Sequence, residues 1–426
     1  MMGNVQDYTL ADPETATCPY EYYKAMRTQD PIHYDEKIKT FIVSRHEDII
    51  KALADPITFS VAHGFNAQER QDYSGEIAEY YRKEKIPPLE RVVTSDPPYH
   101  TRIRSLMEKA FTAHRVAKME TYINDIADDL IQRFAGDGKA ELIEQLAIPL
   151  PIFVIADQLG IPRSDLPSFK RWSDATVEPA GRLLTKERAF WCAEQTVEMW
   201  HYLKERVAER RASPTDDMIS DLVHARIDDP ENPELSPMEL FQVIRAFIVA
   251  GNETTTTAIS NGLLILTRNP DIVERILSSD GDRTLQRLTE EILRLEAPVP
   301  GLPRFATCDA ELGGRQIPKG SLLYLAYASA NRDDAKFEGP DCINLERKNM
   351  GQHLSFGSGI HRCIGSMLAR MEIKVSIRQV AKQLDDMRLA IDERELVYRP
   401  SMVTRTLVSL PVTFIPRSAV HQQQPV

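Results

Sequence analysis

Long apolar runs and an excess of basic residues are both missing from this chain. No stretch reaches ~18 consecutive apolar residues, the length that a membrane-spanning helix needs. The N-terminal residues, MMGNVQDYTLADPETATCPY, contain no positively charged region followed by an apolar one. The formal net charge of −11 argues against a nucleic-acid-binding protein, because neutralising phosphates requires a basic face. We therefore expect a cytoplasmic protein that is not anchored in a membrane and binds no nucleic acid.

Cysteine is scarce, and its spacing is uninformative about disulfides. The five cysteines are odd in number, widely scattered and include no C-x-x-C pair: Cys18, Cys192, Cys308, Cys342 and Cys363. This argues against a disulfide framework and against a structural zinc site. No repeat with a period of ~20 to 50 residues is present, so a solenoid is not expected. With 42% apolar and 27% charged residues, the chain can bury a large core and should be globular.

The pattern of the remaining residues predicts a mainly α-helical protein with a small β-rich region. Three segments have the β-branched and aromatic residues, or the turn signals, of strands: residues 32–45, 311–328 and 405–414. Between the first two lie about 250 residues with helical periodicity.

Other segments are polar and only weakly periodic. Residues 59–88 and 162–182 are therefore candidate mobile lids. Residues 421–426 (HQQQPV) are expected to form a frayed tail.

One long helix is predicted from Ser236 to the Asn269-Pro270 pair. Ser236 is a suitable N-cap, Pro237 occupies the first helical position, and Glu239 can close a capping box. Such a helix would be ~48 Å long at ~1.5 Å per residue. It is apolar nearly all round from Leu240 to Leu266, so we expect it to run through the middle of the protein.

The centre of this helix, AGNETTTT at residues 250–257, has an unusual composition. It places a glycine, a carboxylate and four threonines where a buried helix favours leucine or alanine. Threonine can bond back to the preceding turn, and such sites often bend or bulge helices at functional positions. Threonines simply packed in a helical core remain the alternative. The neighbouring Glu253 favours function, because burying an unpaired carboxylate costs several kcal/mol.

Residues 356–365 read FGSGIHRCIG and are followed by a segment with helical period. Cys363 is thus presented at the start of a helix, among three glycines that let backbone amides approach a ligand closely. The positive end of the helix dipole favours a thiolate there. A lone cysteine at a helix start is otherwise usually a packing residue, but packing requires neither the glycines nor Phe356. A thiolate that ligates iron gains from both, since amides moderate its charge and Phe356 shields it from water.

Four segments together resemble the cytochrome P450 family. FGSGIHRCIG resembles the haem-binding signature, in which the cysteine is the proximal iron ligand. AGNETT resembles the oxygen-activation motif of the central helix, and residues 291–294 (EILR) resemble the Glu-x-x-Arg pair. DPPYHTRIR at residues 96–104 resembles the haem-edge segment of soluble bacterial members. The four signals occur in the family's order, from about residue 90 to about residue 370, and the resemblance covers nearly the whole chain.

The resemblance implies the fold and a cofactor, haem b. It implies one mostly helical domain over residues 1–426, with flexible ends at about 1–10 and 417–426. The pair Glu291 and Arg294 would be buried and locked by Arg347, with Ile343 replacing the usual aromatic residue of that loop. Cys363 would be the only metal ligand. The implied cofactor-binding residues are His100, Arg104, Ala250, Gly251, Arg304, Phe356, Gly357, His361, Cys363 and Gly365, of which His100, Arg104, Arg304 and His361 would bind the propionates.

The implied activity is monooxygenation, the insertion of one oxygen atom from O2 into a substrate. Glu253 and Thr254 would be the catalytic pair that delivers protons. By the same resemblance the substrate pocket is lined from the lid at residues 59–88 and by Ala246, Val249, Ala250, residues 299–302 (including Val299 and Leu302), Val403 and Thr404. These residues are mainly apolar, so a hydrophobic molecule such as a terpenoid, a steroid or a fatty acid is expected to be hydroxylated.

Electrons must be supplied from outside, because the chain has no flavin or iron–sulfur motif. We expect a ferredoxin with its NAD(P)H-dependent reductase to serve a monomeric enzyme. A basic patch for an acidic ferredoxin is predicted from Arg102, Arg104, Lys109, His114, Arg115, Lys118 and Arg362. A solvated helix face is the alternative for this charge run.

Three other functions stay open at the level of sequence. A peroxygenase of the same fold would use hydrogen peroxide and typically lacks the acid–alcohol pair, which is present here. A haem-based sensor or carrier would need the thiolate but no proton relay. A metal-free helical scaffold would leave the glycine-flanked cysteine unexplained.

Overall fold

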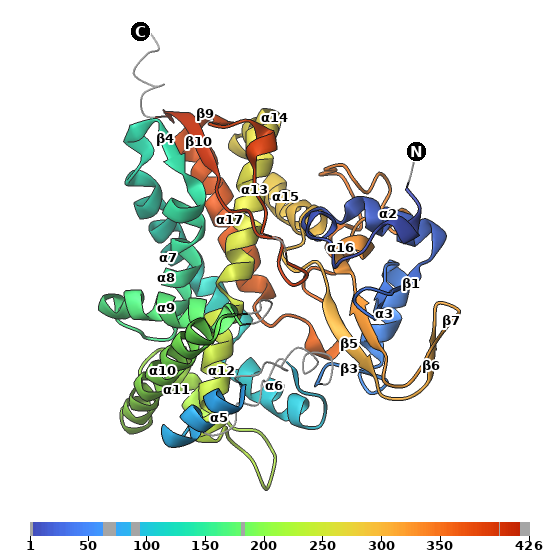
Figure 1. Ribbon diagram of the computed structural model, residues 1–426. Helices are drawn as coiled ribbons and strands as arrows, with labels where there is room; N and C mark the ends of the chain where they lie inside the picture. Colours follow the sequence, from blue (N-terminus) through green and yellow to red (C-terminus); the bar gives the residue numbers. More distant parts are fainter. Residues whose placement is uncertain (1–2, 63–73, 87–93, 180–183, 400, 418–426) are drawn as a thin grey trace. The chain divides into compact units, whose positions relative to one another are not determined.

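The computed structural model describes the chain in several stretches, which fall into two compact units (Figure 1). The described residues are 3–62, 74–86, 94–179, 184–399 and 401–417. The first unit comprises Met1–Phe59, Ala117–Pro151 and Glu253–Val426, and the second comprises Ser60–Val116 and Ile152–Asn252. Each unit is considered by itself.

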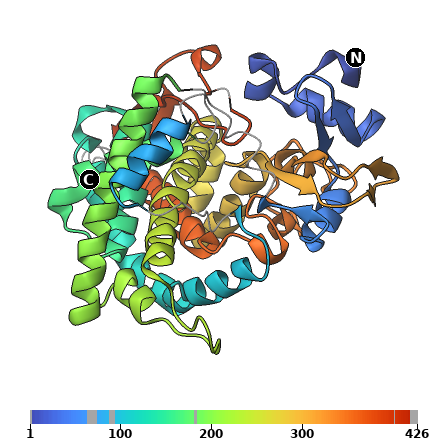
Figure 2. The ribbon, with the colours of Figure 1, turned by 60° about the horizontal axis from the view of Figure 1, so that its bottom comes forward.

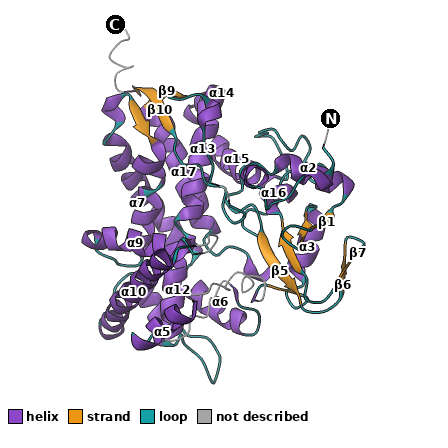
Figure 3. Ribbon diagram, viewed as in Figure 1, coloured by secondary structure: helices purple, strands orange, loops and turns teal. Residues whose placement is uncertain are grey.

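Helices far outnumber strands in the described residues, as Figure 3 shows. The α-helices are α1 (Pro13–Thr17), α2 (Tyr20–Gln29), α3 (His46–Ala54), α5 (Ser74–Lys83), α6 (Tyr99–Ala110), α7 (Ala113–Gln132), α8 (Pro149–Gln158), α9 (Leu166–Val177), α10 (Lys186–Ala212), α11 (Met218–His224), α12 (Pro237–Ala250), α13 (Glu253–Arg268), α14 (Pro270–Leu277), α15 (Gly281–Leu295), α16 (Tyr327–Ala330) and α17 (Ser366–Gln383). The strands are β1 (Ile32–Asp35), β2 (Thr40–Val43), β3 (Phe59–Ser60), β4 (Lys139–Glu141), β5 (Leu302–Ala306), β6 (Ala310–Leu312), β7 (Arg315–Ile317), β8 (Leu322–Leu325), β9 (Leu384–Leu389) and β10 (Pro411–Pro416). The predicted fold class, mainly α with a small β-rich region, is confirmed.

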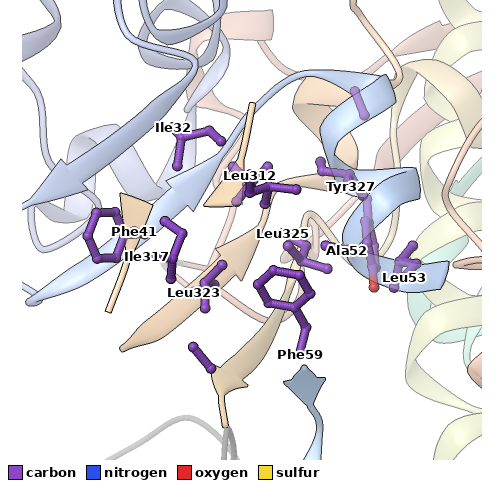
Figure 4. Packing of buried hydrophobic residues seen from close by; sticks show 14 of the residues in the cluster. Ile32, Phe41, Ala52, Leu53, Phe59, Leu312, Ile317, Leu323, Leu325 and Tyr327 are labelled. Carbon is purple, nitrogen blue, oxygen red and sulfur yellow. The ribbon is translucent and has the colours of Figure 1, made fainter. Parts of the chain in front are cut away.

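The largest sheet has the order β1-β2-β8-β5-β3. Apolar side chains that point alternately to its two faces pack it against helices. On β2, Phe41 and Val43 point to one face and belong to a buried cluster that also includes Leu53 of α3; Figure 4 shows Phe41 and Leu53 within this cluster. Ile42 points to the opposite face and packs with α2 residues such as Tyr23. Because side chains alternate along a strand, a continuous apolar run indicates a strand covered on both faces. All four residues of β2 are buried accordingly.

Two of the three predicted strand regions are confirmed, and the third is shorter than predicted. Residues 32–45 form the antiparallel pair β1–β2, and residues 311–328 contain the β6–β7 hairpin and β8. In the third region the strand β10 begins only at Pro411 and runs to Pro416, between β4 and β9. The prediction missed β9, which follows α17 without any turn residue to mark its start.

The second unit is built around α10, its longest helix (green in Figure 2). This helix packs along α9 and α11, and α11 in turn contacts α6. The candidate lid at residues 162–182 is mostly the regular helix α9, with residues 180–182 outside the described residues, and its mobility stays a prediction. The proposed lid at residues 59–88 contains α5, while its residues 63–73 and 87–88 lie outside the described residues, as do residues 421–426.

The predicted long helix is two helices, α12 and α13. Its start is confirmed, because Ser236 and Glu239 form a capping box and Pro237 is the first helical residue. Its end before Pro270 is also confirmed. The break lies at Gly251 and Asn252, where the amide of Asn252 donates to the carbonyl of Val249 at 3.4 Å. This bond spans one residue fewer than a helical bond, which tightens the turn and ends α12.

None of the described helices has the length and apolarity required to cross a membrane.

Candidate functional site

Cys363 lies in a loop shaped by glycine, and its side chain is exposed. Its amide donates to the carbonyl oxygen of Phe356 at 2.9 Å, which closes the loop. Gly357 and Gly359 have φ angles of 64° and 68°, a region that disfavours other residues. A Cβ on Gly359 would lie 2.5 Å from the carbonyl oxygen of Leu53 on α3, so this position also has no room for a side chain. Because the sulfur is exposed, the alternative of a buried packing cysteine is wrong.

Gly365 is the N-cap of α17 and differs from the two other glycines. Its φ of −79° is accessible to any residue, and a Cβ there would meet only the Cys363 Sγ, at 3.9 Å. The protein's own packing therefore does not require glycine at this position. The unpaired amides of the first turn of α17 follow Cys363 directly, and their partial positive charge favours a thiolate.

Phe356 and His361 flank the cysteine in this loop. The ring of Phe356 is half-buried and carries the Arg370 guanidinium 4.4 Å from its centroid. His361 belongs to the short 3-10 helix Gly359–His361 and is also half-buried. The structure thus brings Phe356, Gly357, His361, Cys363 and Gly365 into one loop, as the sequence predicts.

Glu291, Arg294 and Arg347 form a buried ion-pair triad. The Arg294 Nε donates to Glu291 Oε1 at 2.7 Å and its Nη2 to Oε2 at 2.9 Å. The Arg347 Nε donates to Glu291 Oε1 at 3.0 Å. Glu291 and Arg294 have no exposed side-chain surface, and Arg347 has 3%. The burial and the locking by Arg347 agree with the prediction.

The triad also orders the loop that precedes the cysteine segment. Arg294 donates to the carbonyls of Asn331, Pro340 and Cys342, with the shortest bond, 2.6 Å, to Pro340. Phe337, which is fully buried, lies 5.5 Å from the Arg294 guanidinium. Ile343 was expected to replace the aromatic residue of this loop, and the aromatic ring that contacts the triad belongs to Phe337.

Arg304 is a buried cation on β5, 3% exposed. Its Nη1 donates to the carbonyl of Pro303 at 2.7 Å. Within the described part of the chain, no carboxylate forms an ion pair with it. A buried guanidinium without a protein carboxylate is the group that an anionic ligand such as a propionate would pair with.

Glu253 and Thr254 begin α13 and are both half-buried. The next threonines serve packing: Thr256 donates to the carbonyl of Ala147 at 2.9 Å, and Thr257 bonds to the Thr406 hydroxyl at 3.1 Å. The alternative reading of packed threonines therefore holds for these two. The packing interpretation does not apply to Glu253 and Thr254, which are less buried.

The predicted pocket residues lie in both units. In the second unit, Ala246 and Val249 of α12 are half-buried, Ala250 is exposed, and Gly251 follows as the C-cap.

In the first unit, residues 298–302 lead into β5, and residues 402–404 lie beside them. The amide of Arg405 donates to the carbonyl of Pro298 at 3.1 Å, which brings Val403 and Thr404 close to Val299 and Leu302. All four of these pocket candidates are half-buried. That these four residues form one substrate pocket with Ala246 and Val249 of α12 stays a prediction.

His100 and Arg104 lie on α6, in the second unit. His100 is buried, and burial together with the charge of Arg104 lowers its pKa. The Arg104 Nε donates to Glu108 Oε1 at 2.7 Å. Their participation with Cys363 in a single haem site stays a prediction.

The predicted basic patch is weaker than its sequence suggests. Three of its arginines are paired with carboxylates: Arg102 with Glu239, Arg104 with Glu108, and Arg115 with Asp216 and Asp221. The sequence prediction did not include these ion pairs, because most of the pairing carboxylates are distant in the sequence. Lys109, His114, Lys118 and Arg362 are exposed.

The donor set indicates what kind of metal group could bind. In the described residues no group of three or more His, Cys, Asp or Glu side chains could hold a metal ion. A metal bound through Cys363 alone must therefore bring its other ligands with it, as iron in a porphyrin does. The buried Arg304 suits the anionic edge of such a macrocycle. The residues present thus fit a haem.

Comparison with known proteins agrees with this geometry. The family model described as Cytochrome P450 matches residues 182–279 and 283–385. The chain is 34% identical to Cytochrome P450 107B1 of Saccharopolyspora erythraea, over 96% of this chain and 98% of the relative. It is 32% identical to Vitamin D(3) 25-hydroxylase of Pseudonocardia autotrophica, over 94% and 95%. The solved structure of CYP109E1 from Bacillus megaterium in complex with testosterone superimposes with a TM-score of 0.79, at 29% identity, over 93% and 99% of the two chains.

The fold, the cysteine loop and the buried triad agree with these similarities, which extend over nearly the full length of both chains. Proteins of this family use haem b as their cofactor. The chain belongs to the cytochrome P450 family and is a haem-dependent monooxygenase.

Proposed function

We propose that Cys363 would hold the haem, with its thiolate as a ligand of the iron. The observation that carries this proposal is the exposed sulfur in a loop fixed by Gly357 and Gly359, directly before the positive end of α17. When bound, the haem supplies the activation of dioxygen, and electron donation from a thiolate favours cleavage of the O–O bond.

The remaining haem contacts follow from the same site. Arg304 supplies a buried positive charge for a propionate, and His100, Arg104 and His361 are the further propionate donors that we propose. Ala250, Gly251, Phe356, Gly357 and Gly365 are proposed to contact the macrocycle. Small residues suit such positions, because they let the backbone approach a flat ligand closely.

Glu253 and Thr254 are proposed to deliver protons. Thr254 holds a proton on its Oγ1 at the first turn of α13, and the adjacent Glu253 carboxylate exchanges protons with solvent. Their partial exposure supports this role, because a proton relay needs contact with water and the fully buried Thr255 lacks it.

The substrate is proposed to be a hydrophobic small molecule that is hydroxylated. Relatives support this class: one is named for hydroxylating vitamin D3, and the solved structure of another contains testosterone. Val299, Leu302 and Val403 are the apolar pocket residues of the first unit, and Ala246 and Val249 those of the second. Terpenoids, steroids and fatty acids all fit such a lining.

Electrons are proposed to come from NAD(P)H through a ferredoxin and its reductase. Three arginines of the predicted patch are paired, and the exposed residues Lys109, His114, Lys118 and Arg362 are proposed to attract an acidic ferredoxin. Arg362 is exposed and adjoins Cys363 in the chain, so it is the cation nearest in sequence to the proposed iron ligand. A single domain, a monomeric state and a cytoplasmic location likewise stay predictions.

The first experiment is the difference spectrum of the reduced protein exposed to carbon monoxide. We expect a strongly red-shifted Soret band in the wild type and its loss in Cys363→Ala, because only a thiolate ligand produces that shift. Cys308→Ala is the matched control, since Cys308 is also exposed but lies in the turn before β6. A haem-loaded wild type without the band, or a Cys363→Ala protein that keeps it, would overturn the assignment.

A further inference from the structure

Two neighbouring carboxylates on α15 point to different parts of the molecule. Glu291 binds the arginines of the triad, whereas Glu290 contacts α17 and the segment before the cysteine loop. Glu290 accepts from Arg370 on both oxygens, with Nε to Oε1 at 2.5 Å and Nη2 to Oε2 at 3.0 Å. Its side chain is 14% exposed. Glu290 has no part in the haem contacts, the proton delivery or the substrate pocket proposed above.

Arg370 joins this carboxylate to the ring of Phe356. Its guanidinium carbon lies 4.4 Å from the ring centroid while its nitrogens bond to Glu290. Two hydrogen bonds to one carboxylate restrict the rotation of the guanidinium and so hold it near the ring. The contact is a cation–π interaction, which is worth more where water is partly excluded.

His353 contacts the same carboxylate and the same ring. Its Nδ1 accepts the amide of Ser355 at 3.2 Å, so the proton of the neutral ring is on Nε2, which donates to Glu290 Oε2 at 3.2 Å. The imidazole is 1% exposed and lies 5.9 Å from the Phe356 ring centroid. Glu290 thus orients two groups that both contact Phe356.

Phe356 is in turn bonded to Cys363. The carbonyl oxygen of Phe356 accepts the amide of Cys363 at 2.9 Å. Ser355 is tied from the other side, because its Oγ donates to the carbonyl of Leu293 on α15 at 2.6 Å. A displacement of Phe356 would therefore be transmitted to Cys363 through this hydrogen bond.

The charge of Glu290 is maintained against its burial. Burial by itself would raise the pKa of Glu290, but hydrogen bonds from His353 and Arg370 and the charge of Arg370 hold the pKa at about 2. The carboxylate is therefore ionised at any working pH. A neutral amide would offer Arg370 only one acceptor oxygen in place of two.

A cavity of about 490 Å³ lies beside Phe356, and water could approach the ring from it. Its lining includes Phe356, Arg370, Arg362 and Lys336. Phe356 and Arg370 thus both line the cavity, and the Arg370 guanidinium, 4.4 Å from the ring centroid, covers part of the ring. If Arg370 turned away, water could reach the ring from this side, and the apolar cover of a metal ligand controls its solvation and potential.

We propose that Glu290 is a positioning residue which, through Arg370 and His353, holds the Phe356 ring over the cysteine loop and so preserves the thiolate ligation by Cys363. The proposal rests on the function assigned to Cys363 above. The two neighbouring carboxylates then have different roles. Glu291 orders the loop at residues 338–347, and Glu290 holds the segment at residues 353–356.

The test compares haem-loaded wild type, Glu290→Gln and Arg370→Lys. Arg370→Lys keeps the positive charge but loses the two parallel bonds and the flat contact with the ring. Glu120→Gln is the matched control, because Glu120 also accepts from two cations of α17, Lys374 and Arg378. Three properties are measured: the reduction potential, the urea midpoint, and the rate at which the red-shifted carbon monoxide band converts to an unshifted one.

Both Glu290→Gln and Arg370→Lys are expected to raise the reduction potential, because water reaching the thiolate weakens its donation. They are also expected to speed the loss of the shifted band by about tenfold, which corresponds to the loss of roughly one cation–π contact. Glu120→Gln should lower the urea midpoint at most slightly and change neither spectroscopic property.

Wild-type potential and band stability in both variants would overturn the proposal, even if their urea midpoints fell, because a merely structural ion pair predicts that result. Equal changes in Glu120→Gln would overturn it too, since they would show a general loosening of α17. If Glu290→Gln does not fold, Arg370→Lys decides alone. A wild type without the shifted band would instead refute the assignment of Cys363.

Discussion

Replacing Glu291 by Gln should destabilise the protein far more than replacing an exposed carboxylate. Glu291 accepts four hydrogen bonds, from Arg294 twice, from Arg347, and from the amide of Asn344 at 2.8 Å. The variant keeps the shape of the side chain but leaves two buried guanidiniums without a negative charge. Removing one member of a buried ion pair typically costs ~3–5 kcal/mol.

Glu346→Gln is the matched control for this variant. Glu346 pairs with Arg275, Arg283 and Arg287, but it is 65% exposed and its contacts are 3.2–3.9 Å long. Exposed pairs of this kind contribute ~0–1 kcal/mol, since water screens them. The two variants thus remove the same charge from two networks that differ mainly in burial.

The assay is equilibrium unfolding in urea, followed by circular dichroism at saturating haem. A lower midpoint with an unchanged slope reports lost stability, because the slope depends on the surface exposed on unfolding. We expect a large shift for Glu291→Gln and almost none for Glu346→Gln. If the two midpoints fell equally, burial would not be what makes the triad important, and the reasoning would be refuted.

Two further results are expected from positions that the structure marks as strained or buried. Gly359→Ala should cost ~2 kcal/mol or more and reduce haem retention, because its Cβ would lie 2.5 Å from the Leu53 carbonyl oxygen at a positive φ. Gly357→Ala is the control: its Cβ would meet nothing nearer than 3.9 Å, so it should show only the ~1 kcal/mol backbone penalty. Urea midpoints and haem content check this prediction, and equal losses in the two variants would contradict it. Glu372 is fully buried on α17, and burial raises its pKa to about 8 in the folded protein. The folded state then binds a proton that the unfolded state has released, so stability should fall as the pH rises from about 5 to about 8, and Glu372→Gln should flatten this decline in urea midpoints measured across that range.

Features that depend on neighbours in the sequence were predictable here. The capping box of Ser236 and Glu239 spans three residues, and so does the ion pair of Glu291 with Arg294. Glycine also permits the positive φ found at Gly357 and Gly359, although Gly365 of the same segment has a φ of −79°. Local rules also indicated that the segment around Gly251 was unusual, although they did not show that the helix ends there.

Features that join distant parts of the chain were not predictable. Glu290 and Arg370 are 80 residues apart, and nothing near either residue marks the other as its partner. The ion pairs within the predicted basic patch were missed for the same reason: Arg102 pairs with Glu239, 137 residues away. A count of charges along one helix cannot reveal which of them are neutralised by other helices.

The cysteine loop shows why such long-range contacts are needed. A loop built on Gly357 and Gly359 has little side-chain surface with which to pack, and glycine adds conformational freedom to the unfolded chain. Its order must therefore come from groups outside it. The structure supplies them from α15, where Glu290 reaches the Phe356 side of the loop through Arg370 and His353, and Leu293 binds Ser355. A helix fixed by the buried Glu291 network is rigid enough to serve as this support, so the stability of the triad and the geometry of the proposed iron ligand depend on the same few turns of α15.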